Sequence, residues 1–274
     1  MPELSVVVLA YRAEERTGDV VVPLYDLLEA EGISYEMIVV ANYWSGDDST
    51  PVVAAALARE RDTIRVVARP KRGDMGWDMR SGLGAAGGCF LVVIDGDGQV
   101  PVEYALEAYR RLRTAGAPIV KGRRYLREDG SVRTLVSLGF NALFWLLFRT
   151  RGLWDVNGRP KGMTREAYEQ LDLQTDDWFT DAELLLKARR LGLEVHEFPV
   201  RFLVNPARAS FVGPATVWEF LRNMTLTRLG LHPALRRPPV PRHPVGAPPA
   251  DGMSTDPAAE EEAAPLVASR PKRP

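Results

Sequence analysis

Short apolar segments alternate with amphipathic segments along most of the chain. Five segments have the nearly continuous apolar character of buried strands, and they cover residues 4–10, 35–41, 64–70, 89–94 and 117–122. The segments between them have helical periodicity; for example, apolar side chains within residues 20–28 recur on one helical face. This alternation predicts an α/β fold with a mostly parallel, doubly wound sheet flanked by helices.

The apolar pattern ends near His232. Residues 232–274 are rich in proline, alanine and charged residues and have no apolar periodicity. Such a composition cannot bury enough apolar surface to offset the entropy that folding costs. We therefore predict one folded domain over residues 1–231 and a disordered tail over residues 232–274.

Charge and cysteine content narrow the class of protein. The chain has 35 basic and 36 acidic residues, so its formal charge of −1 gives no indication of nucleic-acid binding. The single cysteine, Cys89, has apolar neighbours and is expected in the core, which favours a reducing, cytoplasmic compartment. The N-terminal residues lack the pattern of a signal peptide. The longest apolar stretch, residues 140–148, is too short to span a bilayer, so we expect a core helix or an interfacial one.

Two carboxylates and an amide follow the predicted strand 89–94 at alternate positions: Asp95, Asp97 and Gln99. Alternate residues of an extended segment point the same way, and their oxygens suit a hard cation such as Mg²⁺ or Mn²⁺. Ligands of doubly wound sheets bind beyond the carboxyl ends of the strands, where Asp95 lies. A metal at this position could bridge a diphosphate and stabilise a departing nucleoside diphosphate.

The same segment has two other interpretations. Asp-Gly is common in turns, so a polar turn that ends the strand explains the pattern equally well. A calcium loop would need glycine at its sixth position and glutamate at its twelfth, where this chain has Val100 and Leu106. The pattern by itself therefore leaves a metal site and a polar turn open.

The order and spacing of six segments resemble the family 2 glycosyltransferases with a GT-A fold, particularly the branch of polyprenyl-phosphate (dolichyl-phosphate) hexose synthases. These segments cover residues 5–15, 38–50, 78–103, 119–125, 155–168 and 178–202. The resemblance implies a GT-A-like fold and an inverting, metal-dependent transfer of a sugar from a nucleotide-sugar donor to a polyprenyl phosphate. It also implies peripheral contact with the inner face of a membrane.

The resemblance assigns roles to individual residues. Asp95 and Asp97 would be catalytic and, with Gln99, would handle the metal and the diphosphate. The substrate-binding residues would include Tyr11 near the nucleotide base, Asp48, the phosphate contact Arg124, Arg133, Ser137 and Arg208. Asp48 would replace an acidic residue that the family has earlier, where this chain has Ala41 or Asn42. Arg208 lies near a family arginine whose slot holds Asn205.

Three more polar residues have alternative interpretations. Asp181 begins a helical pattern, where it either stabilises the helix dipole or serves as a base or acceptor-positioning group. A hydroxyl acceptor would need such a base, whereas a phosphate acceptor is already ionised. Arg159 and Lys161 lie in a segment with proline and glycine, which predicts a loop. They are either solvated there or contact a phosphate group.

At this point the sequence leaves more than one acceptor and more than one activity open. The apolar stretch 140–148 follows Arg133 and Ser137, and the basic segment 149–152 after it suits anionic headgroups, which favours a lipid acceptor. One alternative keeps the donor and uses the hydroxyl of a soluble glycan, metabolite or natural product. Another alternative is a nucleotide-sugar-binding protein with weak catalysis. The unusual segment 41–48 is the feature that supports it.

Overall fold

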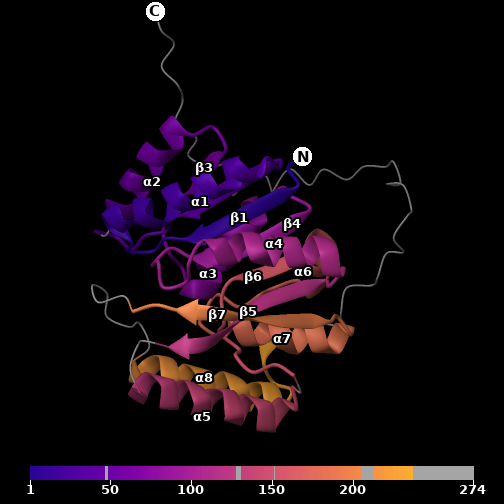
Figure 1. Cartoon of the computed structure of the whole chain (residues 1–274). Helices are drawn as coiled ribbons and strands as arrows, with labels where there is room; N and C mark the ends of the chain where they lie inside the picture. The colour runs from indigo at the N-terminus through magenta and orange to yellow at the C-terminus, as the bar shows by residue number, and fades with distance from the viewer. Residues whose placement is uncertain (47–48, 128–130, 151, 205–212, 237–274) are drawn as a thin grey trace, which may run out of the picture. The chain divides into compact units, whose positions relative to one another are not determined.

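The computed structural model describes residues 1–46, 49–127, 131–150, 152–204 and 213–236 (Figure 1). The strands of these residues are β1 (Leu4–Leu9), β2 (Tyr35–Val40), β3 (Ile64–Val67), β4 (Phe90–Asp95), β5 (Ile119–Arg127), β6 (Lys161–Thr164) and β7 (Val195–Phe202). The helices are α1 (Thr17–Glu31), α2 (Ser49–Glu60), α3 (Met75–Ala85), α4 (Glu103–Ala115), α5 (Ser131–Phe148), α6 (Arg165–Leu171), α7 (Thr180–Leu191), α8 (Pro214–Arg228) and α9 (Pro233–Arg236).

The described strands form one sheet in the order β3-β2-β1-β4-β6-β5-β7. The pairs β1–β2, β1–β4, β2–β3 and β5–β7 are parallel, and β6 runs antiparallel to both β4 and β5. The order reverses at β1, because β2 lies on one side of it and β4 on the other. The prediction of a mostly parallel α/β sheet flanked by helices is confirmed.

Alternate side chains of β1 divide the core into two layers. Val6 and Val8 pack with α1, α2 and α4 on one face of the sheet. Val7 and Leu9 pack with α3, α6 and α7 on the other face. The period of two along each strand explains why a nearly continuous apolar segment marks a strand that is covered on both sides.

The sequence pattern does not predict β6. Lys161 was expected in a loop, but it pairs with Val93 of β4 and Lys121 of β5 in the sheet. Gly162 lets the strand fit, because a Cβ there would lie 2.9 Å from the side chain of Val120. A strand of four residues that contains a lysine and a glycine has too little apolar pattern to be recognised. The prediction for Cys89 is also wrong, since this residue is exposed just before β4.

The folded structure continues past residue 231. His232 is buried, and α9 packs Ala234 and Leu235 into the core beside α7. Arg190 of α7 donates to the carbonyl of Leu235. The described fold therefore extends to residue 236, beyond the predicted domain end at 231. Residues 237–274 lie outside the described residues, so the disorder of the tail stays a prediction.

Within the described residues, every helix is too short or too polar to cross a membrane.

Candidate functional site

Asp95, Gly96 and Asp97, called the DxD segment from here on, lie where β4 ends. Asp95 is the last residue of β4, and both it and Asp97 are partly exposed. The Gly96 N–H donates to the Leu9 carbonyl at 2.8 Å, and a Cβ on Gly96 would lie 2.9 Å from that oxygen. This close approach to β1 requires glycine, and it fixes the backbone between the two aspartates.

Gln99 completes a polar turn and joins it to the end of β7. Asp97 Oδ1 accepts the Gln99 N–H at 3.0 Å, which is an Asx-type turn. The Gln99 side-chain amide donates to the Leu203 carbonyl at 3.2 Å, and the Leu203 N–H donates to the Gln99 carbonyl at 2.8 Å. The two interpretations of this segment, a polar turn and a metal site, are therefore compatible. The turn itself holds two carboxylates at the end of the strand.

The chemistry of these side chains fits a cation that is shared with a ligand. In the described part of the chain, no group of three or more His, Cys, Asp or Glu side chains is arranged to hold a metal. Asp95 and Asp97 could supply two oxygen ligands, and Mg²⁺ commonly takes one or two carboxylates and fills its other positions with phosphate and water. The residues present therefore suit a diphosphate-bound cation better than a site made by protein alone.

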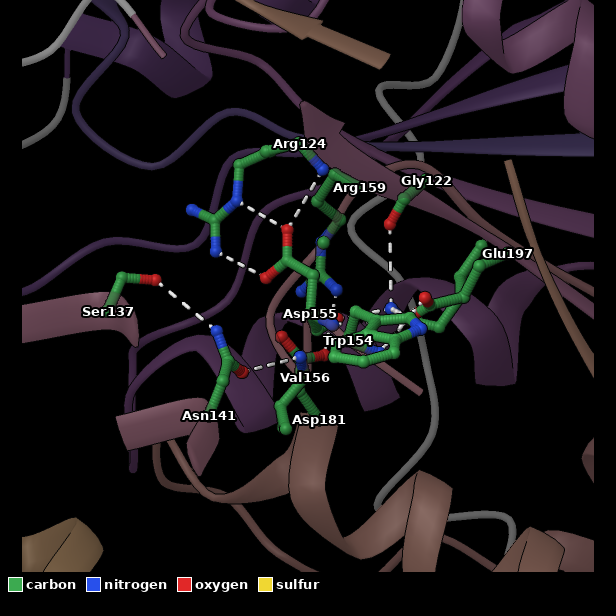
Figure 2. A network of polar contacts seen from close by, with 12 residues as sticks. Gly122, Arg124, Ser137, Asn141, Trp154, Asp155, Val156, Arg159, Asp181 and Glu197 are labelled. Carbon is green, nitrogen blue, oxygen red and sulfur yellow. Dashed lines mark hydrogen bonds and ion pairs between the residues drawn. The ribbon is translucent and has the colours of Figure 1, made fainter. Parts of the chain in front are cut away.

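A buried arginine links the DxD segment to α7. Arg159 Nε donates to Asp95 Oδ1 at 3.3 Å, and its Nη1 donates to Asp181 Oδ1 at 2.7 Å. Its Nη2 contacts the Met75 sulfur at 3.1 Å, and Lys161 Nζ lies 3.0 Å from the same Asp181 oxygen. The side chains of Arg159, Lys161 and Asp181 are at most 3% exposed. Figure 2 shows Arg159 and Asp181 among the other residues of this polar network.

The charged neighbours in this cluster, together with burial, shift the pKa values of Asp181, Lys161 and Arg159. Burial alone would raise the pKa of Asp181, but Arg159 and Lys161 outweigh it and hold that pKa below its ordinary value. Burial lowers the pKa of Lys161 to about 7, with a further contribution from Arg159. Asp181 and Asp95 raise the pKa of Arg159 above its ordinary value in spite of its burial. Asp181 and Arg159 are therefore both ionised near neutral pH.

The first interpretation of Arg159 and Lys161, as solvated residues of an exposed loop, is wrong. Both are buried, and Lys161 also donates to the carbonyls of Val156 and Gly158 at 3.1 and 3.0 Å. Their partners are carboxylates, carbonyls and the Met75 sulfur, and contact with a substrate phosphate stays a prediction. Asp181 lies in the first turn of α7, as expected, although it is fully buried there.

A second ion pair holds the predicted phosphate contact, Arg124 of β5. Its Nε and Nη2 donate to the two carboxylate oxygens of Asp155 at 2.8 and 2.6 Å, and its backbone N–H donates at 3.0 Å (Figure 2). Burial would raise the pKa of Asp155, but Arg124 and Lys121 keep it well below its ordinary range. This two-pronged contact fixes the plane of the guanidinium group.

The loop of residues 154–158, which contacts β5 through Asp155 and Arg124, is also tied to β7 and α5. Glu197 of β7 accepts the N–H groups of Trp154 and Asp155 at 3.0 and 3.2 Å. Asn141 of α5 accepts the Val156 N–H at 3.0 Å, and its amide donates to Ser137 at 3.5 Å (Figure 2). The predicted residue Ser137 is therefore linked to Arg124 through Asn141, Val156 and Asp155. The side chain of Arg133 and all of Asp48 and Arg208 lie outside the described residues.

A third cluster surrounds Tyr11, which follows β1. Lys71 Nζ lies 4.1 Å from the centre of the Tyr11 ring and forms a buried ion pair with Asp78 of α3. Asn42, after β2, donates to Asp78 at 2.9 Å and accepts the Arg69 N–H at 2.9 Å. The side-chain amide of Asn42 therefore hydrogen-bonds to Asp78 and to the Arg69 backbone. This is one of the two positions at which the family-like segment would have an aspartate.

A comparison with models of known protein families assigns this chain to a family. The model of the family described as "Glycosyl transferase family 2" matches residues 5–171, which is more than half of the 274 residues. The chain belongs to glycosyl transferase family 2. The predictions of the family and of a glycosyltransferase are confirmed.

The curated relatives of this glycosyltransferase include one archaeal and two eukaryotic enzymes. Glycosyltransferase AglD of Haloferax volcanii is 34% identical over 72% of this chain and 32% of its own length. A dolichyl-phosphate beta-glucosyltransferase of Drosophila melanogaster is 29% identical over 73% of this chain and 67% of its own, and that of Trichomonas vaginalis, ALG5A, is 25% identical over 73% and 65%. The chain thus spans about a third of AglD and about two thirds of the other two relatives.

Solved structures show the same fold. Glucosyl-3-phosphoglycerate synthase from Mycobacterium tuberculosis, with Mn²⁺, uridine diphosphate (UDP) and glucosyl-3-phosphoglycerate, has a TM-score of 0.63 and 22% identity over 84% of this chain and 81% of that one. The same enzyme with Mg²⁺ and UDP has a TM-score of 0.61 and 22% identity over 84% and 80%. This likeness confirms the GT-A-like fold of this glycosyltransferase.

Sequence reasoning missed several residues that build the site. Asp155, Asn141 and Glu197 hold the loop 154–158, and Lys71 and Asp78 hold Tyr11. Asp155 begins a segment that resembles the family, which was the available signal for it. Asp78 and Glu197 also lie in such segments, whereas Asn141 and Lys71 lie outside them and had no sequence signal.

Proposed function

We propose that this glycosyltransferase transfers a sugar from a nucleotide-sugar donor to a polyprenyl phosphate, with inversion at the anomeric carbon, at the cytoplasmic face of a membrane. Asp95 and Asp97 would hold Mg²⁺ or Mn²⁺, and Gln99 would hold their turn in place. A bound cation would neutralise charge on the departing nucleoside diphosphate. The apolar outer surface of α5 and α8 is the observation that carries the choice of a lipid acceptor.

This outer surface contrasts with that of an ordinary helix. In α5, Leu135, Leu138, Trp145 and Leu146 are 48 to 71% exposed, and residues 134–148 contain no charged residue. Phe140 packs on Phe220 of α8 with ring centres 4.8 Å apart, and the two helices lie together at one edge of the domain (Figure 1). An exposed apolar helix face of this kind is typical of a binding or membrane surface.

The neighbouring surface of α8 favours a membrane over a protein partner. Val217, Trp218 and Leu221 are exposed on α8, whose Phe220 packs on α5, and the exposed charged residues of α8 are Arg222 and Arg228. Exposed tryptophan and leucine with a basic rim are typical of a helix that lies at an anionic bilayer surface. Asn141 ties α5 to the loop 154–158, so a lipid at this surface would lie beside the site.

The surroundings of Asp181 also favour a phosphate acceptor. A base must come within hydrogen-bond distance of the acceptor hydroxyl, but the Asp181 side chain is 1% exposed and one of its oxygens already contacts Arg159 and Lys161. A phosphate monoester brings an oxygen that is already deprotonated. Arg124, which Asp155 holds in a fixed plane, is our candidate for contact with phosphate.

The relatives support both substrates. Two of them are dolichyl-phosphate beta-glucosyltransferases by name, which supports a polyprenyl phosphate as the acceptor. The structures with UDP and with Mn²⁺ or Mg²⁺ support a nucleotide-sugar donor and a divalent cation.

A donor and acceptor screen tests the proposal. Radiolabelled nucleotide sugars are incubated with the protein and vesicles that contain polyprenyl phosphate, with and without EDTA, and the product is partitioned between butanol and water. We expect label in butanol that depends on the lipid phosphate and disappears with EDTA. Label that stays in water and needs a soluble hydroxyl acceptor would establish the soluble-acceptor alternative. Nucleotide binding without turnover under any condition would establish the binding-protein alternative.

A further inference from the structure

Arg159 occupies a fixed position beside the DxD segment. The backbone around it packs tightly on β5, because a Cβ on Gly122 would lie 2.0 Å from the Arg159 carbonyl. The Gly122 N–H donates to the Pro160 carbonyl at 2.8 Å. Asp181 fixes the other end of the side chain through its 2.7 Å contact with Nη1. The guanidinium group is therefore held from both ends, by the glycine of β5 and by the carboxylate of α7.

This arrangement puts a permanent positive charge next to the carboxylate that would bind a cation. Arg159 Nε lies 3.3 Å from Asp95 Oδ1, and a guanidinium group stays protonated under all conditions in which proteins fold. Asp95 is 32% exposed, so a cation could approach its outer side, while Arg159 is 3% exposed behind it. Poor screening by water in such a partly buried position strengthens the repulsion between Arg159 and an arriving cation.

We propose that Arg159 lowers the affinity of Asp95 and Asp97 for a free divalent cation, so that the cation binds tightly only together with a nucleoside diphosphate. This inference rests on the proposed metal-dependent function. The diphosphate brings its own negative charges and oxygen ligands, and these outweigh the repulsion by Arg159. Asp181 is then a positioning residue, because it keeps Arg159 beside Asp95 without contacting the substrate.

The consequence for the enzyme is an order of binding. A site that takes up cations only with the diphosphate releases its metal when the nucleoside diphosphate leaves. Such a site also stays free of a divalent cation when no nucleotide-sugar donor is bound. The inference predicts a gain of metal affinity when the charge of Arg159 is removed, which damage to the fold would not produce.

Electron paramagnetic resonance of Mn²⁺ tests this prediction, since the signal of the free ion falls on binding. MnCl₂ is titrated into the wild type, Arg159→Met and Arg159→Lys, with and without UDP, and Asp95→Asn gives the background from other sites. Without UDP, we expect Arg159→Met to bind Mn²⁺ about tenfold or more tightly than the wild type. Arg159→Lys keeps the charge and should bind as weakly as the wild type. With UDP, the wild type should bind Mn²⁺ tightly.

The outcomes separate this inference from the function on which it rests. Equal Mn²⁺ affinities of the wild type and Arg159→Met without UDP, or weaker binding by a folded Arg159→Met, would overturn the role of Arg159 while leaving metal dependence intact. If the wild type binds no Mn²⁺ even with UDP, the metal-dependent function itself fails. Circular dichroism checks folding, and if Arg159→Met is unfolded, the double variant Arg159→Met with Asp181→Asn removes both charges of the pair and should show the same gain.

Discussion

The N-terminal strands β1–β4 and the C-terminal strands β5–β7 differ in how much charge they bury. In the first group, the buried side chains of the sheet are mostly apolar, and the charged exception is Glu36 of β2, which contacts Ser5 and Arg65. Helix α4 covers one face of these strands and has Arg110 and Arg111 exposed on its outer side. In the second group, Lys121 and Lys161 are completely buried in adjacent strands, while α5 and α8 expose leucine and tryptophan. The second region thus has charge inside and apolar side chains outside.

This difference indicates that the buried charges of the second region serve a purpose other than stabilising the fold. Like charges on directly opposite residues destabilise a sheet, and buried ion pairs seldom repay the cost of removing them from water. Lys121 is offset by Glu197 and Lys161 by Asp181, and the same contacts hold the loop 154–158 and Arg159 in place. We infer that the buried charges are retained because they position the site.

The largest expected effect lies in the first region, at Asp97. Asp97→Ala should lower turnover on the order of 10²- to 10³-fold, because the variant loses a charged oxygen ligand that is needed most in the transition state. Asp62→Ala, at an exposed position away from the strand end, is the control. Initial rates with Mn²⁺ are the measurement. Near-normal turnover of Asp97→Ala in EDTA-treated buffer would contradict a role in metal binding.

The second prediction compares the outer surfaces directly. Aspartate at Trp145 and Leu146 of α5 should weaken binding to anionic vesicles about tenfold or more, since two apolar side chains lose their place in the interface. Aspartate at Arg111 and Thr114 of α4 adds at least as much negative charge on an ordinary outer surface and should change binding little. Vesicle co-sedimentation measures both. Equal losses in the two variants would show that net charge, and not the apolar surface of α5, governs binding.

The third prediction concerns Asp181 as a positioning residue. With polyprenyl phosphate, Asp181→Asn should lower turnover less than about tenfold, whereas the loss of a true base costs roughly 10²- to 10⁴-fold. The asparagine keeps an oxygen for Arg159. The pH–rate profile should keep its shape, and Arg124→Ala should lose more activity, because a phosphate contact disappears. A base-sized loss together with a changed acid limb would assign Asp181 to catalysis and favour a hydroxyl acceptor.

The smallest expected effect is at the end of the second region. A chain that ends at Val240 should keep its melting temperature and its donor affinity, because it retains α9. A chain that ends at Gly230 loses the buried Leu235, worth about 1.5–3 kcal/mol, and should melt roughly 5 °C lower. Thermal unfolding by circular dichroism measures both. If the Val240 chain melts as low as the Gly230 chain, residues beyond 240 contribute to the fold.

Local patterns in the sequence determined the N-terminal strands and the position of the DxD segment. A buried strand needs only a few consecutive apolar residues, so β1, β2 and β4 were recognisable from the sequence. Asp95 and Asp97 follow β4 directly, and the carboxyl end of a strand in such a sheet is where ligands bind. The resemblance of ordered motifs then identified the family, which the comparisons confirm.

Only the tertiary structure decided how the charges of the second region are used. Arg159 is 64 residues from Asp95 and 22 residues from Asp181, and no spacing along the chain encodes these contacts. A lysine or arginine next to proline and glycine reads as a solvated loop, since burying a charge is costly unless a partner is present. In this chain the partners come from β4 and α7, and the sheet brings them together. The burial of Lys161 and the pairing of Arg159 therefore depend on the assembled sheet, because each charge is stable there only when its distant partner is in place.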